Sequence, residues 1–528
     1  MSYTTPAEPP VLRLSGITKR FGGLTANDAI SFELNRGEVI ALLGENGAGK
    51  TTLMNILFGH YVADEGSIEA LGQTLPPGDP KAALAAGIGM VHQHFTLADN
   101  MTVLENITLG TQSLWRPRLY RASARTRIAK LAADFGLAVN PDARVGALSV
   151  GERQRVEILK ALYRDARVLI LDEPTAVLTP AETEALFSTL KMLVANGLSI
   201  IFISHKLGEV MAVSDRVLVL RSGRLTGERT TAETTRAELA TLMVGREVQL
   251  PPIVDVPFGG RAVVMEAIST AGKSSGAPLV RASLTLKNGE ILGIAGVSGN
   301  GQTALAAVLS GSEPPTEGNI VLAGQAHAPW SPLEALGLGI GRIPEDRHAI
   351  GTIGDMTVTE NMILESYRSP RFCRHGFVDW RAARAFAEEV IADYEVKCPS
   401  PEARIRLLSG GNMQKLILGR VLDPKPRIII ANQPTRGLDV GAVAYVHTRL
   451  IAARDRGAAV LLISEDLEEI MALCDRIAVI SKGQISTVSK RGERTIGEIG
   501  QLMAGHVEVL PSPRLRGEGA QRADEGLS

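Results

Sequence analysis

The sequence predicts an α/β fold built from two tandem domains, each with a mostly parallel sheet at its centre and an attached helical subdomain. Two observations carry this prediction. The same series of motifs occurs twice, in the same order, along the 528 residues of the chain. Within each series, short apolar runs typical of buried strands alternate with longer stretches of helical periodicity, as in parallel α/β proteins. The length alone suggests two to four domains, which two copies of one domain satisfy.

An internal repeat establishes the two copies. Lys50 in GENGAGKT matches Gln302 in GVSGNGQT, 252 residues later, whereas Asp172 matches Asn432, 260 residues later. The offset therefore grows by eight residues in the middle of the repeat and is otherwise constant. This pattern indicates a duplication followed by a small insertion.

The repeat also sets the domain boundaries that we expect. Copy one should span residues 11–250 and copy two residues 261–510. Between them, residues 251–260 are rich in proline and glycine, as expected of a linker. Residues 1–10 form an N-terminal tail, and residues 511–528 have no apolar periodicity, which predicts a disordered tail.

Composition excludes several classes of protein. The formal net charge of −1 gives no bulk electrostatic case for binding nucleic acid. The three cysteines are far apart and lack metal-ligand spacing, which fits a reducing cytosol. No apolar run approaches the roughly 18 residues of a membrane-spanning helix, and the N-terminus does not read as a secretory signal. We expect a cytoplasmic protein that can still attach to a membrane through partners.

The elements of copy one follow from local patterns. Residues 181–197 have helical periodicity, and the segment 97–150 also looks more helical than extended. Within that segment, Thr102 and Glu105 form a plausible capping box at a helix start. The apolar runs predict strands over residues 38–44, 167–172 and 199–204.

The first chemical motif is a phosphate loop, GENGAGKT, at residues 44–51. It follows an apolar strand and precedes a helix-like run, the context that the motif requires. Its glycines let backbone N–H groups close on phosphate oxygens at a helix N-terminus. Lys50 can reach the β- and γ-phosphates, and the Thr51 hydroxyl can bind Mg²⁺. The nucleotide contacts expected here are Gly44, Asn46, Gly47, Gly49, Lys50, Thr51 and Thr52.

Two acids, Asp172 and Glu173, follow the apolar run VLIL. The aspartate is placed to hold Mg²⁺ through water, and the glutamate to polarise an attacking water. An Asp-Glu pair on its own is more often a solvated turn. Its position 122 residues after Lys50, followed by Pro174-Thr175, favours the catalytic interpretation.

Two related pentapeptides, LSVGE at residues 148–152 and LSGGN at residues 408–412, each precede a helix-like run. Serine and glycine at a helix start can donate hydroxyl and backbone N–H groups to an anion. Taken alone, either pentapeptide would be read as an ordinary helix cap. Because both occupy the same place in their copies, we interpret them as anion-binding signatures.

Together these motifs resemble the ATP-binding cassette (ABC) ATPases over nearly the whole chain. The phosphate loop, Gln93, the signatures, LDEP and His205 occur in the order of that family. In the family, two cassettes face each other head to tail, and each ATP lies between one cassette's phosphate loop and the other's signature. The resemblance implies that Phe21 stacks on adenine, Gln93 contacts Mg²⁺ and the attacking water, and His205 touches the γ-phosphate. Without the resemblance, Phe21 would equally be read as a core residue.

The resemblance divides the motifs between two composite ATP sites. In site one, Glu173, His205 and Gln93 would be catalytic, and Thr51, Gln93 and Asp172 would hold Mg²⁺. Copy two would complete site one with Ser409, Gly411, Asn412 and Asp439. Site two would take Gly296, Gly301, Gln302, Thr303, Glu345, Asn432, Gln433 and Glu465 from copy two, facing Ser149 and Gly151 of copy one.

The defects fall in site two and spare site one. Copy two lacks the lysine and both acids, Val150 replaces the usual signature glycine, and Thr179 stands where the loop aspartate is expected. No aromatic residue near position 273 matches Phe21. Loss of a positioned general base costs about 10²–10⁴ in rate, so we predict that only site one hydrolyses ATP. The sequence leaves open whether site two binds nucleotide.

Two function classes fit fused cassettes: a transport ATPase that docks on separate permeases, and a soluble cassette protein of translation or repair. One competent site, a short linker and no basic patch favour the transporter. More closely, the chain resembles the ATPases of bacterial simple-sugar and nucleoside importers. Asn432-Gln433 and the motif QPTRGLDVGA favour a nucleoside, with a ribose-, xylose- or galactose-type sugar as the alternative.

The importer interpretation implies cofactors, partners and a location. ATP and Mg²⁺ would be bound. Two integral-membrane permease subunits and an extracytoplasmic solute-binding lipoprotein would be the partners, with no nucleic acid. The chain would lie peripherally on the cytoplasmic face of the inner membrane. Residues 94–106 and 346–361 would line the groove for the permeases.

Overall fold

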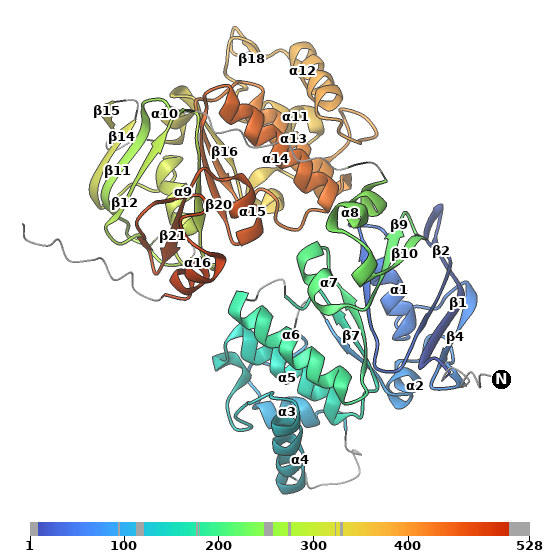
Figure 1. Cartoon of the computed structure of the whole chain (residues 1–528). Helices are drawn as coiled ribbons and strands as arrows, with labels where there is room; N and C mark the ends of the chain where they lie inside the picture. Colours follow the sequence, from blue (N-terminus) through green and yellow to red (C-terminus); the bar gives the residue numbers. More distant parts are fainter. Residues whose placement is uncertain are drawn as a thin grey trace, which may run out of the picture.

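The computed structural model describes residues 9–92, 95–111, 121–175, 178, 180–245, 247, 257–272, 276–322, 324–327 and 331–505. Figure 1 shows two α/β copies, copy one in blue to green and copy two in yellow-green to red. Each copy contains a larger, mostly parallel sheet, a smaller antiparallel sheet and a group of helices at one side. The predicted fold class is confirmed.

The larger sheet of copy one has the strand order β10-β9-β3-β8-β7-β6. Strand β3 pairs in parallel with β8 on one side and β9 on the other, and β10 closes the edge antiparallel to β9. Strands β3 and β8 are buried throughout, as expected where helices cover both faces of a parallel sheet. The strands are β3 (Val39–Gly44), β6 (Ile88–Val91), β7 (Val168–Asp172), β8 (Ser199–Ile203), β9 (Arg216–Arg221) and β10 (Arg224–Thr230).

A second, antiparallel sheet of copy one has the order β2-β1-β4-β5 and was not predicted from the sequence. Burial alternates at the start of β1, where Leu12 and Leu14 are buried and Arg13 is exposed. Gly16, with φ of 62°, lies at a register shift that interrupts this alternation, so the strand pattern is broken in the sequence. The strands are β1 (Leu12–Phe21), β2 (Leu24–Leu34), β4 (Glu65–Ala70) and β5 (Gln73–Thr74).

The helices of copy one agree with the sequence patterns. The predicted helical segment contains α3 and α4, and Thr102 with Glu105 forms the expected capping box at the start of α3. The predicted helix over 181–197 is α6. The helices are α1 (Lys50–Leu57), α2 (Pro80–Ala85), α3 (Val103–Thr108), α4 (Arg121–Asp134), η1 (Val145–Ala147), α5 (Val150–Tyr163), α6 (Pro180–Ala195), α7 (Leu207–Val213), η2 (Thr231–Glu233) and α8 (Arg236–Val244).

Copy two repeats this plan, with sheets ordered β16-β19-β20-β13-β21-β22 and β12-β11-β14-β15. Its strands are β11 (Arg261–Ser269), β12 (Ala282–Lys287), β13 (Ile291–Ala295), β14 (Glu317–Leu322), β15 (Gln325–His327), β16 (Ile340–Ile343), β17 (Cys373–Arg374), β18 (Phe377–Val378), β19 (Ile428–Asn432), β20 (Ala459–Ser464), β21 (Arg476–Ser481), β22 (Gln484–Ile485) and β23 (Ser489–Lys490). Its helices are α9 (Gln302–Leu309), α10 (Pro332–Gly337), the π-helix η3 (Arg347–Gly351), α11 (Val358–Met362), α12 (Trp380–Asp393), η4 (Ile405–Leu407), α13 (Gly410–Leu422), α14 (Val440–Asp455), α15 (Leu467–Leu473) and α16 (Ile496–Met503). The π-helix and the β17–β18 hairpin lie in the segment where the repeat offset grows.

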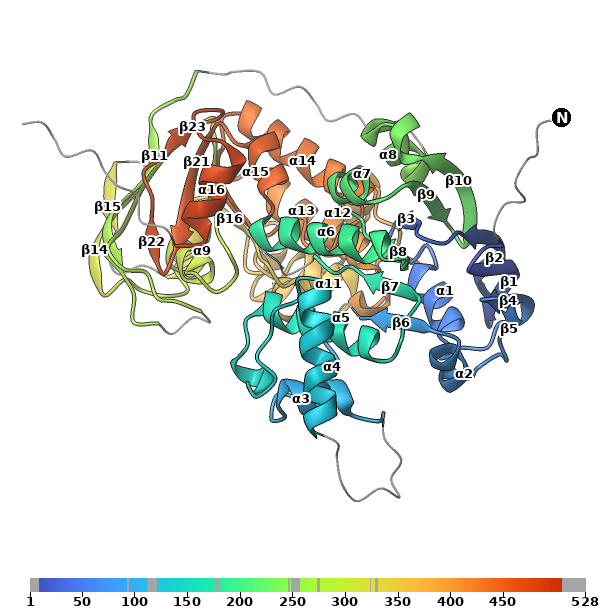
Figure 2. The same ribbon diagram turned by 60° about the horizontal axis from the view of Figure 1, so that its bottom comes forward.

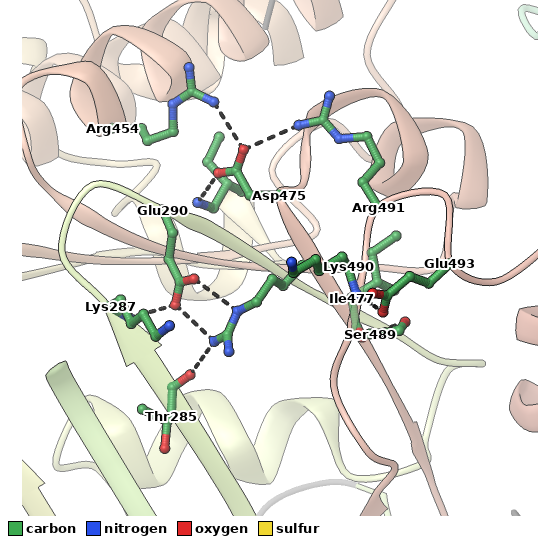
Figure 3. Close-up of polar contacts among 12 residues, drawn as sticks. Thr285, Lys287, Glu290, Arg454, Asp475, Ile477, Ser489, Lys490, Arg491 and Glu493 are labelled. Atoms are coloured by element: carbon green, nitrogen blue, oxygen red, sulfur yellow. Dashed lines mark hydrogen bonds and ion pairs between the residues drawn. The ribbon is translucent and has the colours of Figure 1, made fainter. Parts of the chain in front are cut away.

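Buried ion pairs fix the central strands of copy two (Figure 3). The Asp475 carboxylate accepts hydrogen bonds from Arg454 at 3.2 Å, from Arg491 at 3.1 Å and from the backbone N–H of Ile291 at 2.8 Å. Glu290, fully buried, pairs with Arg476. Burial raises the pKa of Glu290 although Arg476 opposes the shift. These pairs join the start of β13 to the start of β21 and so hold the strand that leads into the loop before α9.

The two copies contact each other through α8 and α14, as Figure 1 shows, and Figure 2 gives a second view of the pair. Val440 at the start of α14 packs against an apolar cluster of copy one that includes Leu239 and Met243 of α8. Arg236 at the start of α8 also forms an ion pair of 3.5 Å with Glu468 of α15. Among the helices that the structure describes, none is both long and apolar enough to cross a lipid bilayer.

Candidate functional site

The phosphate loop of copy one joins the end of β3 at Gly44 to the start of α1 at Lys50. Gly49 has φ of 100°, and a Cβ there would lie 2.2 Å from the carbonyl oxygen of Ala26, so only glycine fits. Gly47 is also left-handed, with φ of 82°. Thr51 and Thr52 lie in the first turn of α1. The loop therefore presents backbone N–H groups at a helix N-terminus, the geometry that binds phosphate.

Lys50 lies folded over this loop. Its Nζ donates to the carbonyl oxygens of Gly44 at 2.6 Å and Glu45 at 3.0 Å. Burial lowers the pKa of Lys50, and the nearby carboxylates of Glu173 and Asp172 oppose that shift. A buried ammonium bonded to carbonyls is ready to exchange these neutral acceptors for a phosphate anion, which forms stronger, charge-assisted bonds.

The two acids lie at the carboxyl end of β7. Burial raises the pKa of Asp172, and the charge of Glu173 adds to the shift. Burial would also raise the pKa of Glu173, but its hydrogen bond from His205 and nearby positive charges hold that pKa below its ordinary value. The His205 Nδ1 lies 2.9 Å from Glu173 Oε1. The pair thus couples an ionised carboxylate to the histidine that follows β8, an arrangement suited to orienting a water molecule.

Several oxygen donors in site one suit Mg²⁺. Thr51 lies in the first turn of α1, and Asp172 is the last residue of β7. Hydroxyl and carboxylate oxygens are the ligands that Mg²⁺ prefers, and they leave room for water and phosphate oxygens. The residues fit the ion, which would neutralise phosphate charge there. Gln93, the third predicted ligand, lies outside the described residues, as do Thr179 and position 273.

Phe21 lies at the end of β1 and is 46% exposed, so it is not the core residue that the sequence allowed as an alternative. Its ring packs edge-on against Tyr61, with centroids 5.8 Å apart, and Lys19 Nζ lies 5.4 Å from its centroid. An exposed aromatic face of this kind can stack on a nucleotide base. Sequence reasoning missed Tyr61, which belongs to no motif.

Copy two reaches the phosphate loop of copy one. Asn46 Nδ2 donates to the carbonyl oxygen of Gly437 at 2.8 Å. Two residues later, Asp439 caps α14 by accepting from the N–H of Ala442 at 2.8 Å. Burial raises the pKa of Glu45, and the charge of Asp439 adds to the shift, which places Asp439 close to the same loop. These contacts place the loop before α14 of copy two against the phosphate loop of copy one.

The two signature serines are helix N-caps. Ser409 caps α13, accepting from Asn412 N at 3.4 Å and Asn412 Nδ2 at 2.9 Å. Ser149 caps α5, accepting from Glu152 N at 3.3 Å. In the part of the chain that the structure describes, no hydrogen bond joins Ser409, Gly411 or Asn412 to the phosphate loop of copy one. One indirect link exists: Asn412 Oδ1 accepts from the N–H of Lys397, whose charge acts on Glu45.

Copy two builds the same backbone around different side chains. Gly301 has φ of 111° and precedes Gln302 and Thr303 in the first turn of α9, as Gly49 precedes Lys50. Asn432 ends β19 as Asp172 ends β7. The next residues, Gln433 and Glu173, both have a positive φ, of 50° and 46°. The remaining residues predicted for site two are Gly296 directly after β13, Glu345 paired with Arg436, Glu465 after β20, and Ser149 and Gly151 at the start of α5.

Comparison with known proteins places these two sites in a family. The ABC transporter family matches residues 27–176 and 279–436. The chain is 44% identical to the nucleoside import ATP-binding protein NupA of Lactococcus lactis, over 94% of this chain and 99% of that protein. It is 45% identical to the guanosine import ATP-binding protein NupO of Bacillus subtilis, over 94% and 98%. It is 41% identical to the glucose import ATP-binding protein TsgD13 of Haloferax volcanii, over 94% and 96%. The chain belongs to the ABC transporter family, as a transport ATPase in which two ATP-binding domains are fused.

Proposed function

We propose that this ATPase powers nucleoside import and that site one alone performs the hydrolysis. The difference between the two copies supports this assignment. In copy one, Glu173 pairs with His205 near Lys50. The matching positions of copy two hold Gln433, Glu465 and Gln302. Copy two keeps the intact signature LSGGN, which it would lend to site one.

In the proposed mechanism, Lys50 and the loop amides hold the β- and γ-phosphates, and the Ser409 hydroxyl closes on the γ-phosphate from copy two. Thr51, Asp172 and Gln93 would hold Mg²⁺, which spreads phosphate charge in the transition state. Glu173 would accept a hydrogen bond from the attacking water and polarise it. His205, held now by Glu173, would turn toward the γ-phosphate. Asp439 would position the loop that Asn46 contacts.

The solute is proposed from the likeness of the chain to its relatives. Two of the relatives described above are named for nucleoside or guanosine import, at 44% and 45% identity. The glucose-import relative, at 41%, keeps a simple sugar as the alternative. A thermal-shift screen of the partner solute-binding protein tests the choice. A ligand at about 100 times its Kd adds about 2.7 kcal/mol of stability. Stabilisation by ribose or xylose, with none by nucleosides, would reverse the assignment.

The proposed partners are two integral-membrane permeases and an extracytoplasmic solute-binding lipoprotein, with the chain on the cytoplasmic face of the inner membrane. A pocket of about 190 Å³ supports a docking groove in copy one. Its walls include Met90, His92, Thr96, Glu157 and Lys160, next to the predicted groove segment. Purification of the chain with its permeases tests this assembly. A stable complex with RNA or ribosomes, and none with permeases, would overturn it in favour of a translation factor.

A further inference from the structure

The phosphate loop of copy two is filled by its own side chains. Gln302, at the position of Lys50, is only 4% exposed. Its Nε2 donates to the carbonyl oxygen of Val297 at 2.7 Å, and its Oε1 accepts from the backbone N–H of Asn300 at 2.9 Å. A lysine can only donate, so Lys50 leaves the amides of its loop to an incoming phosphate. Gln302 does both, and it takes up one of the loop N–H groups itself.

A carboxylate lies near the same loop on its other side. Glu465 follows β20 at the position of His205, and its side chain lies close to Ser298, which matches Asn46 in the loop. Its backbone N–H also donates to Gln433 Oε1 at 3.4 Å. In copy one the corresponding residues turn elsewhere: His205 bonds to Glu173, and Asn46 bonds to Gly437 of copy two.

The charges around this loop oppose a triphosphate. Glu465 lies close enough to Glu345 for their charges to interact, and neither the lysine nor the histidine of copy one has a cationic counterpart. Arg436 and Lys206 of copy one are the cations that act on Glu465, and Arg436 is already paired with Glu345. A polyphosphate would have to bind near the carboxylates of Glu465 and Glu345. Like charges in a partly buried site disfavour each other strongly.

We propose that copy two binds no nucleotide, because Gln302 already accepts a hydrogen bond from an N–H of its phosphate loop, and Gln302 and Glu465 replace Lys50 and His205 of copy one. In site one, Lys50 can only donate and leaves the loop amides to a phosphate. Copy two would thus keep one conformation throughout the cycle and present its signature to site one without a nucleotide of its own. The inference concerns copy two and does not depend on the solute carried.

Nucleotide stoichiometry tests the proposal on the full chain. Equilibrium dialysis with the Mg²⁺ complex of a non-hydrolysable ATP analogue should give one equivalent per chain. The Lys50→Ala variant should then bind no analogue at analogue concentrations up to about 1 mM. A second equivalent in the wild type, or saturable binding in Lys50→Ala, would overturn the proposal.

Hydrogen exchange tests the occupation of the loop. Amides of residues 296–301 should exchange at the same rate with and without the analogue. Gln302→Ala should speed exchange of the Asn300 amide about tenfold, because it removes the oxygen that accepts from that N–H. Glu468→Ala, at an exposed glutamate outside this loop, is the control and should change nothing there. Analogue-dependent protection of this loop, or no effect of Gln302→Ala, would contradict the proposal.

Discussion

The two signature serines offer a matched pair of mutations. Ser409→Ala and Ser149→Ala each remove a helix N-cap whose hydroxyl accepts a backbone N–H, at 3.4 Å from Asn412 and at 3.3 Å from Glu152. Loss of such a cap costs about 1 kcal/mol of stability. Because each serine caps its helix by accepting from the N–H three residues later, the two variants should lose similar stability. A difference in activity between them would then report the difference between the two sites.

Activity should separate the pair. The Ser409 hydroxyl is proposed to donate to the γ-phosphate in site one, and a hydrogen bond to a charged group is worth about 1.5–3 kcal/mol. If that bond is made in the transition state, Ser409→Ala should lower kcat/KM about 10- to 150-fold. Ser149 faces the site without a general base, so Ser149→Ala should lower it less than about threefold, through stability alone.

Steady-state ATPase assays on the purified chain, with thermal unfolding of each variant in parallel, provide the comparison. A loss confined to Ser409→Ala at equal stability supports one hydrolytic site built from both copies. Equal losses from the two serines would refute the reasoning, because the sites would then be functionally symmetric despite the missing acids of copy two.

Three further predictions follow from the same geometry. Glu173→Gln should lower kcat about 10²–10⁴-fold while nucleotide still binds, because the water-polarising carboxylate is lost; Gln433→Ala, its counterpart in copy two, should have a small effect. Chelation of Mg²⁺ with EDTA should abolish hydrolysis, and added Mg²⁺ should restore it; full activity in EDTA would exclude the ligand role given to Thr51 and Asp172. Arg454→Ala should destabilise copy two by about 3 kcal/mol in urea unfolding, since Asp475 loses a buried partner, whereas the exposed Arg456→Ala should change stability by less than about 0.5 kcal/mol.

Much of the architecture could be predicted because the chain repeats itself. The strands that carry the phosphate loop and the acids are continuous apolar runs, so periodicity alone located β3, β7 and β8. The capping box of Thr102 and Glu105 was also readable, because it depends only on residues three apart. The antiparallel sheet was not, since the bulge at Gly16 breaks the alternation of β1.

The site was predictable as a set of residue types and less so as a set of contacts. Motif order assigned Lys50, Glu173 and His205 to one place, but the bond between His205 and Glu173 depends on how two neighbouring strands end. The bond by which Gln302 accepts from the N–H of Asn300 depends on the side-chain conformation, which the motif does not give. The sequence therefore identifies the catalytic side chains that copy two lacks. The structure adds the contacts that their replacements make, such as those of Gln302.

Nucleotide trapping tests the central claim most directly. The chain would be incubated with a radiolabelled, photoreactive ATP analogue, Mg²⁺ and orthovanadate, which holds the hydrolysed nucleotide in its site. Irradiation, followed by cleavage at a protease site engineered into the linker, then separates the copies. The account predicts about one trapped nucleotide per chain, with the label on copy one, near Phe21. Label divided between the two copies, or two trapped nucleotides per chain, would contradict it.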